Sequence, residues 1–226
     1  MISHDQFDTF GAGIPASEIS LSSFVIGVAG KANSGKDTFY KFLQAELRKA
    51  HHVGLKESFA YALKAGYSAM FGIPMDLLDD PEFKEQINPY TGTTHRRELQ
   101  LLGTEHYRQR TNNMDVWIQL LAKRLTKVYN FSANWSERPI FIITDCRFDN
   151  ESVFCQNNGI VVKIDRGDTN PVIDNATHAS EAGLSTDTKY VIKNTGTLED
   201  YQKAVQKFVW NDLLPLINSY TSCEKK

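Results

Sequence analysis

The stretch SFVIGVAGKANSGKDTFYKF, residues 23–42, decides the fold. Residues 23–30 are apolar or small, include β-branched side chains and end in glycine, which is typical of a short buried strand. After Thr38 the apolar side chains recur with the spacing of one helix face, at Phe39, Phe42, Leu43 and Leu47. The stretch therefore predicts a strand, a tight glycine-containing turn and an amphipathic helix, in that order.

The turn matches the phosphate-loop pattern GxxxxGK. Its glycines let backbone N–H groups turn toward phosphate oxygens, the helix N-terminus adds partial positive charge, and the lysine reaches the outer phosphates. We therefore expect this loop to bind the phosphates of a nucleoside triphosphate. The predicted ATP-binding residues of this loop are Gly30, Ala32, Asn33, Ser34, Gly35, Lys36 and Thr38.

Asp37 departs from the generic pattern, which has the Mg²⁺-ligating hydroxyl of Ser or Thr at this position. A triphosphate would repel a carboxylate unless the carboxylate faced a metal ion, a bound water or a substrate hydrogen. We favour contact with Mg²⁺ through a water. The alternative is a carboxylate that only stabilises the first turn of the helix.

Further strands are predicted at residues 139–145 and 159–166 and at KYVIK (189–193), with a weaker one within residues 51–58. Helices are expected between them, and a last helix over about 198–213 begins with a capping box of Thr197 and Asp200. This alternation predicts an α/β fold with a three-layer, mostly parallel sheet. Ligands bind at the carboxyl ends of such strands, where Gly30, Asp145 and Arg166 are expected.

Composition excludes several classes. The net charge of -2 gives no drive toward nucleic acid or an anionic membrane. Three cysteines without CxxC spacing argue against a zinc site or a disulfide scaffold. No apolar run approaches the roughly 18 residues that span a bilayer. We therefore expect a soluble, cytoplasmic protein with neither nucleic-acid nor membrane partners.

Several blocks, in this order and spacing, resemble the deoxynucleoside monophosphate kinases of tailed bacteriophages, a branch of the P-loop nucleoside monophosphate kinases. The blocks are SGKDT (34–38), FAYALK (59–64), LQLLGTEHYR (99–108) followed by Trp117, TDCRFDNE (144–151), THASEAGL (177–184) and NTGTLED (194–200). The resemblance implies one kinase domain over 23–215, with a helical substrate-binding insert about 57–130 and a lid about 166–188. Residues 1–22 would be an N-terminal arm without a counterpart in the family, and 216–226 a C-terminal tail.

The residues themselves leave some roles open. Asp145 could hold a magnesium-bound water, organise the acceptor or close the strand end in a salt bridge, and Arg147 could pair with it or with phosphate. Trp117 could stack on a base or belong to the core. The arginines and Lys64 of the helical segment could grip a monophosphate.

By the resemblance, the catalytic residues are Lys36, Asp37, Arg108, Asp145 and Arg147. The acceptor-side residues are Lys64, Arg97, Glu105, Arg108, Trp117, Asp145, Arg147, Glu151, His178 and Glu181. Further ATP-side residues are Arg166, Asn194, Gly196 and Thr197. Asp37, through water, and Asp145 would be the metal residues.

The expected reaction transfers the ATP γ-phosphoryl group to a deoxynucleoside 5′-monophosphate, with ATP and Mg²⁺ as cofactors. Two alternatives stay open. One is a small-metabolite kinase resembling dephospho-coenzyme A kinase or phosphomevalonate kinase, and the other is a nucleotide-binding module without turnover. The base, the sugar selectivity and the oligomeric state stay open, with a homodimer as one expectation, and a phage-encoded chain would work in the host cytoplasm.

Overall fold

The computed structural model describes residues 14–135, 137–167, 184 and 188–223. The predicted site residues His178 and Glu181, most of the expected lid and residues 1–13 of the expected arm lie outside these ranges. The chain forms two compact units. We call Phe59–Lys123, with Ile14 and Pro15, the helical unit, and Ala16–Ser58 with the described residues from Arg124 onward the sheet unit.

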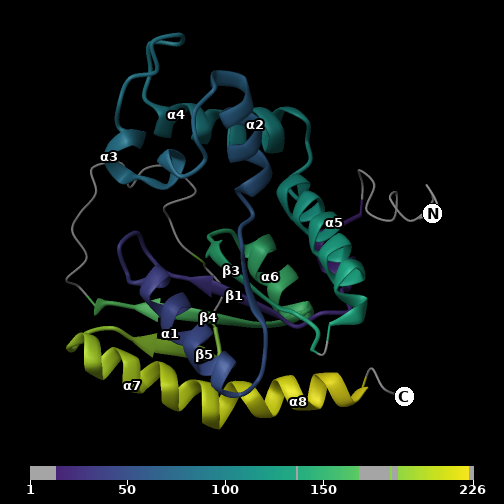
Figure 1. Ribbon diagram of the computed structural model, residues 1–226. Helices are drawn as coiled ribbons and strands as arrows, with labels where there is room; N and C mark the ends of the chain where they lie inside the picture. The colour runs from purple at the N-terminus through teal and green to yellow at the C-terminus, as the bar shows by residue number, and fades with distance from the viewer. Residues whose placement is uncertain (1–13, 136, 168–183, 185–187, 224–226) are drawn as a thin grey trace. The chain divides into compact units, whose positions relative to one another are not determined.

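The described strands of the sheet unit form one parallel sheet in the order β2-β3-β1-β4-β5 (Figure 1). The strands are β1 Val25–Ala29, β2 Gly54–Glu57, β3 Ile140–Cys146, β4 Gly159–Asp165 and β5 Tyr190–Lys193. Every residue of the central strand β1 is buried, as its apolar run requires. The predicted α/β fold class is confirmed.

Helices cover both faces of this sheet. On one face, α1 Lys36–Lys49, α7 Leu198–Phe208 and α8 Leu214–Cys223 pack over Ile26 and Val28 of β1. On the other face lies α6 Asp149–Asn157, which approaches β1 so closely that a Cβ added at Gly27 would lie 2.7 Å from Cys155 Sγ. Glycine at position 27 therefore permits the three-layer packing.

The C-terminal helical segment is longer than the sequence predicted. The expected helix ended near Leu213, but α7 continues through a π-helical turn, η8 Val209–Leu213, into α8, which ends at Cys223. Leu214 and Ile217 are buried in the core, and this burial keeps the chain helical. Residues 216–223 of the expected tail are thus helix. The Thr197–Asp200 capping box is confirmed.

Residues 16–22 of the expected arm belong to the sheet unit. A 3₁₀ turn, η2 Ala16–Glu18, is followed by the buried residues Ile19 and Leu21. The side chain of Asn158 holds this segment, because it accepts from the Leu21 N–H at 2.6 Å and donates to the Ile19 carbonyl at 2.9 Å. Residues 16–22 therefore pack as a core element.

The helical unit consists of short helices joined by turns. They are α2 Tyr61–Phe71, η3 Leu77–Asp79, α3 Pro81–Lys84, α4 His95–Gln100, the π-helical η4 Leu101–Arg110 and the first part of α5 Val116–Phe131, which is followed in the sheet unit by η5 Ser132–Asn134. It contains a buried hydrogen-bonded cluster, in which the hydroxyl of Tyr67 contacts His95 Nδ1 at 2.8 Å and accepts from Asn88 at 2.9 Å. Among the described residues, no helix is long and apolar enough to cross a membrane.

Candidate active site

The loop after β1 has the backbone that its glycines predict. Gly30 has φ 147° and Gly35 has φ 100°, and Asn33 adopts φ 58° between them. The ammonium of Lys36 lies over the loop, donating to the carbonyls of Gly30 at 2.8 Å and Lys31 at 2.7 Å. The lysine is thus fixed at the N-terminus of α1, where a phosphate would bind.

Side chains from three distant elements hold the outer side of the loop. Arg166, directly after β4, donates to the carbonyl of Asn33 at 2.8 Å. Asn194, directly after β5, donates to the carbonyl of Ser34 at 2.9 Å, and the hydroxyl of Tyr201 donates to that of Gly35 at 3.2 Å. In a trans peptide the N–H opposes the C=O. The N–H groups of Gly35 and Lys36 therefore face away from Asn194 and Tyr201.

These contacts give Arg166 and Asn194 a role in shaping the loop, while their predicted contact with ATP stays a prediction. Thr197 caps α7, and a Cβ added at Gly196 would lie 2.9 Å from Asp200 Oδ2. The predicted contact of these two residues with ATP also stays a prediction. Burial raises the pKa of Tyr201, so its hydroxyl stays protonated as a donor.

Asp37 has a partner that the sequence did not predict. Its carboxylate Oδ1 lies 2.8 Å from the ammonium of Lys56 in β2. The hydrogen bond from Lys56 is the main reason that the pKa of Asp37 lies below its ordinary value, and burial opposes the shift. Asp37 is therefore ionised at neutral pH, and its contact with a metal-bound water stays a prediction.

Asp145 lies where β3 changes register. Gly27 pairs with Ile143 but Ala29 pairs with Cys146, so β3 has one more residue than β1 across this step. Such a bulge redirects side chains at a strand end. The Asp145 carboxylate accepts a hydrogen bond of 2.7 Å from the hydroxyl of Ser58, which follows β2.

Next to this contact lies an ion pair that sequence reasoning missed. Arg124 of α5 binds the carboxylate of Glu57 and donates to the carbonyl of Ser58 at 3.3 Å. Burial raises the pKa of Glu57, while Arg124 lowers it and the nearby charge of Asp145 raises it further. The local pattern offered no signal, because the two partners are 67 residues apart and each is an ordinary charged residue within its own element.

The carboxylate of Glu151 caps the N-terminus of α6. It is 2% exposed and accepts from the backbone N–H groups of Arg147 at 2.8 Å and Phe148 at 3.1 Å. This structural role accounts for the residue by itself. Acceptor binding by Glu151 and by the Arg147 side chain stays a prediction.

Five predicted acceptor-side residues fall in the helical unit: Lys64, Arg97, Glu105, Arg108 and Trp117. Lys64 pairs with Asp79, and Arg97 lies 3.0 Å from Glu105. Arg108 is only 5% exposed, within the π-helical η4. π-Helical turns are rare and often occur at functional sites, which makes Arg108 a notable residue of this unit.

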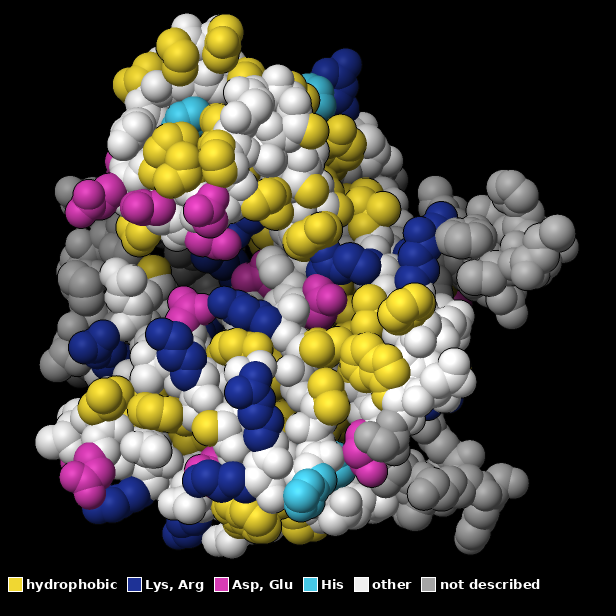
Figure 2. All heavy atoms as spheres, viewed as in Figure 1, with side chains coloured by type: hydrophobic (Ala, Val, Ile, Leu, Met, Phe, Trp, Pro, Cys, Tyr) yellow, Lys and Arg dark blue, Asp and Glu magenta, His cyan; other side chains and the backbone are white. Residues whose placement is uncertain are grey.

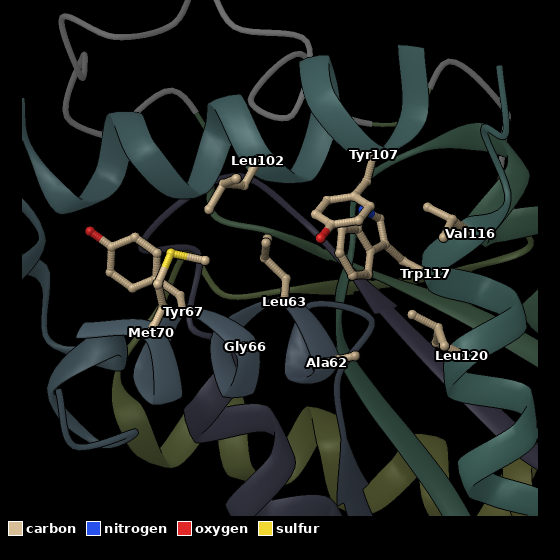
Figure 3. A pocket seen from close by; sticks show the side chains of 10 residues that line it. All are labelled: Ala62, Leu63, Gly66, Tyr67, Met70, Leu102, Tyr107, Val116, Trp117 and Leu120. Atoms are coloured by element: carbon tan, nitrogen blue, oxygen red, sulfur yellow. The ribbon is translucent and has the colours of Figure 1, made fainter. Parts of the chain in front are cut away.

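An apolar cavity of about 230 Å³ opens between α2, η4 and α5 of the helical unit (Figure 3). The ring of Trp117 lines it, and its Nε1–H donates to the carbonyl of Gly103 at 2.7 Å. Tyr107 meets this ring edge-on, with 5.3 Å between ring centroids. Trp117 is both a core residue and a cavity wall. The cavity is lined by Ala62, Leu63, Gly66, Tyr67, Met70, Leu102, Tyr107, Val116, Trp117 and Leu120.

The oxygen donors present suit Mg²⁺ bound together with nucleotide phosphates. Mg²⁺ keeps several waters and usually takes one or two carboxylates besides the phosphates. Asp145, and Asp37 through water, could supply these. Within the part of the chain that the structure describes, no group of three or more His, Cys, Asp or Glu side chains gathers as a dedicated metal cage.

A parallel sheet with a glycine- and lysine-containing loop at the end of its central strand is typical of phosphate-binding P-loop proteins. A model of the family described as deoxynucleotide monophosphate kinase matches residues 81–205, more than half of the chain, and the chain belongs to this family. It is therefore a phosphotransferase enzyme. The match includes Arg108, Trp117, Asp145 and Asn194, and the P-loop precedes it. A comparison with curated proteins finds no match.

Proposed function

We propose that this enzyme transfers the γ-phosphoryl group of ATP to a 2′-deoxynucleoside 5′-monophosphate, giving the diphosphate and ADP. The observation that carries the proposal is the P-loop of the sheet unit. Lys36 is fixed over it, and Asn194 and Tyr201 hold its carbonyls. Together with the helix N-terminus, this arrangement suits a triphosphate.

We assign the base of the acceptor to the cavity of the helical unit. Its lining is mainly apolar and aromatic, as sites for flat ring systems are, and Trp117 and Tyr107 offer ring surfaces. Arg108, Arg97 and Lys64 in the same unit could bind the monophosphate. Because Arg97 and Lys64 are paired with carboxylates, each would exchange that partner for phosphate.

The chemistry needs no general base. An oxygen of the acceptor phosphate is already ionised near neutral pH and attacks the γ-phosphorus in line. Lys36 and the arginines would stabilise the charge on the transferred group. Mg²⁺, held by Asp145 and through water by Asp37, would neutralise charge on the ATP phosphates when bound.

A coupled ADP-release assay with ATP and each common deoxynucleoside monophosphate tests the proposal. We expect turnover with at least one acceptor and its loss in Lys36→Ala. Lys207→Ala, an exposed lysine of α7, is the matched control and should retain activity. A folded sample that binds ATP yet phosphorylates none of the acceptors would overturn the proposal and favour a binding module. Ribonucleoside monophosphates in the same panel would report the sugar selectivity.

The homodimer, expected from the family resemblance, and the cytoplasmic location, expected from the sequence composition, remain proposals. Light scattering of the purified protein tests the first, because a dimer would have twice the chain mass of 25.6 kDa.

A further inference from the structure

Lys56 and Asp37 form an ion pair on the surface at the first turn of the P-loop helix. The Lys56 side chain is 46% exposed and that of Asp37 is 79% exposed. Solvent screens such a pair and the side chains lose entropy in forming it, so it contributes little to stability. Protein stability alone therefore gives little reason for a lysine at this point.

The position of the pair suggests a reason. Asp37 directly follows Lys36 and occupies the place where the generic loop has an uncharged hydroxyl. A carboxylate there repels the phosphates that the loop would bind. Lys56 supplies a positive charge at the same point, which offsets the substitution.

Two contacts fix the Lys56 ammonium near this turn. It hydrogen bonds to Asp37 and lies 5.5 Å from the ring centre of Tyr40, one helical turn further along α1. Lys56 belongs to β2, which pairs with β3 and not with β1. The lysine therefore comes from a different strand than the P-loop, which follows β1. Figure 2 shows lysine and arginine side chains gathered on the face of the sheet unit that carries α1.

We propose that Lys56 is a second phosphate-binding lysine of this loop, and that Asp37 positions its ammonium. The ligand is the triphosphate chain of a nucleotide. The inference rests on the proposed function only in that the P-loop binds a triphosphate, and it requires no acceptor.

Calorimetric titration with ATP in the presence of EDTA tests the proposal without metal or turnover. Lys56→Met should bind ATP about tenfold more weakly than the wild type, as expected for loss of an exposed charge-assisted contact. The loss should be similar with inorganic tripolyphosphate, because the contact is to phosphate. Lys207→Met should leave both affinities unchanged. Lys56→Gln serves as a second variant, with thermal unfolding to confirm that each is folded.

A double variant separates phosphate binding from simple neutralisation of Asp37. In an Asp37→Asn background, Lys56→Met should still bind ATP more weakly than its parent, but by less than about tenfold, because the Asp37 carboxylate no longer positions the ammonium. If the double variant binds as tightly as Asp37→Asn alone, Lys56 only screens the carboxylate and the proposal is wrong. Wild-type affinity in Lys56→Met would also overturn it. Failure of the kinase assay with these ATP affinities intact would contradict the proposed function and leave this inference standing.

Discussion

The side-chain amide of Asn194 donates a 2.9 Å hydrogen bond to the carbonyl of Ser34, a residue 160 positions earlier in the chain. Asn194 is itself fixed, because its backbone N–H donates to the carbonyl of Asp165 at 2.7 Å. The contact thus ties the carboxyl ends of β4 and β5 to the P-loop. The hydrogen bond fixes the peptide group between Ser34 and Gly35. The N–H of Gly35 in this peptide points opposite to the bonded carbonyl.

Replacing Asn194 with alanine should weaken ATP binding. One hydrogen bond is lost, worth about 1 kcal/mol or roughly a fivefold change in affinity. Asn194→Asp should be weaker still, because an ionised carboxylate cannot donate and would in addition repel the Ser34 carbonyl oxygen and the phosphates. Calorimetric titration measures both. Asn157→Ala removes a comparable contact to the Ser17 carbonyl and should leave ATP affinity unchanged. Equal ATP affinity in Asn194→Ala and the wild type would contradict this role.

Gly35→Ala should disrupt the same loop more severely. Position 35 has φ 100°, a backbone conformation that residues with a side chain rarely adopt. The new Cβ would also lie 2.4 Å from Asn194 Nδ2. We expect a loss of about 1–3 kcal/mol in the free energy of unfolding, together with loss of ATP binding. Chemical denaturation and titration measure these. Adding Asn194→Ala removes the clash but not the backbone strain, so stability should recover only in part. Full recovery would show that strain is unimportant here.

Trp117→Phe should destabilise the protein by about 1–3 kcal/mol, because the buried carbonyl of Gly103 loses its donor. If the cavity binds the acceptor base, the KM for the deoxynucleotide should also rise while that for ATP stays the same. Trp135→Phe is the control, since this ring is 40% exposed and lies outside the cavity. A Trp117→Phe protein with wild-type stability would mean that the hydrogen bond contributes nothing.

The half-buried Glu57 predicts a specific pH dependence. Its pKa in the folded protein is above the ordinary value of 4.5, so the folded protein holds this proton more tightly than the unfolded chain. The resulting stabilisation is fully present below pH 4.5 and is lost as the pH rises through the folded-state pKa. The free energy of unfolding of the wild type should therefore fall, relative to Glu57→Gln, as the pH rises above 4.5. Denaturant titrations at several pH values measure the difference, and parallel curves for the two proteins would contradict it.

The P-loop could be predicted because its determinants are local. An apolar run makes β1, glycine permits the positive φ at Gly35, and Lys36 follows at once. The Glu57–Arg124 pair could not be predicted in this way. Its partners belong to β2 and α5, and only the folded chain brings them together. Glu151 shows a second limit of local patterns, because only the structure shows that this carboxylate caps α6, while its assignment to the substrate stays a prediction.

The sequence by itself determined the strand, loop and helix at residues 23–49, the alternation that gives a parallel sheet, and the family. These follow from periodicity and motif, which are properties of neighbouring residues. The tertiary structure alone decided that Lys56 partners Asp37, that Asn194 and Tyr201 hold the loop, and that a cavity opens beside Trp117. The reason is physical: these contacts join residues far apart in the chain, and they depend on the strand order and helix packing, which no local pattern encodes.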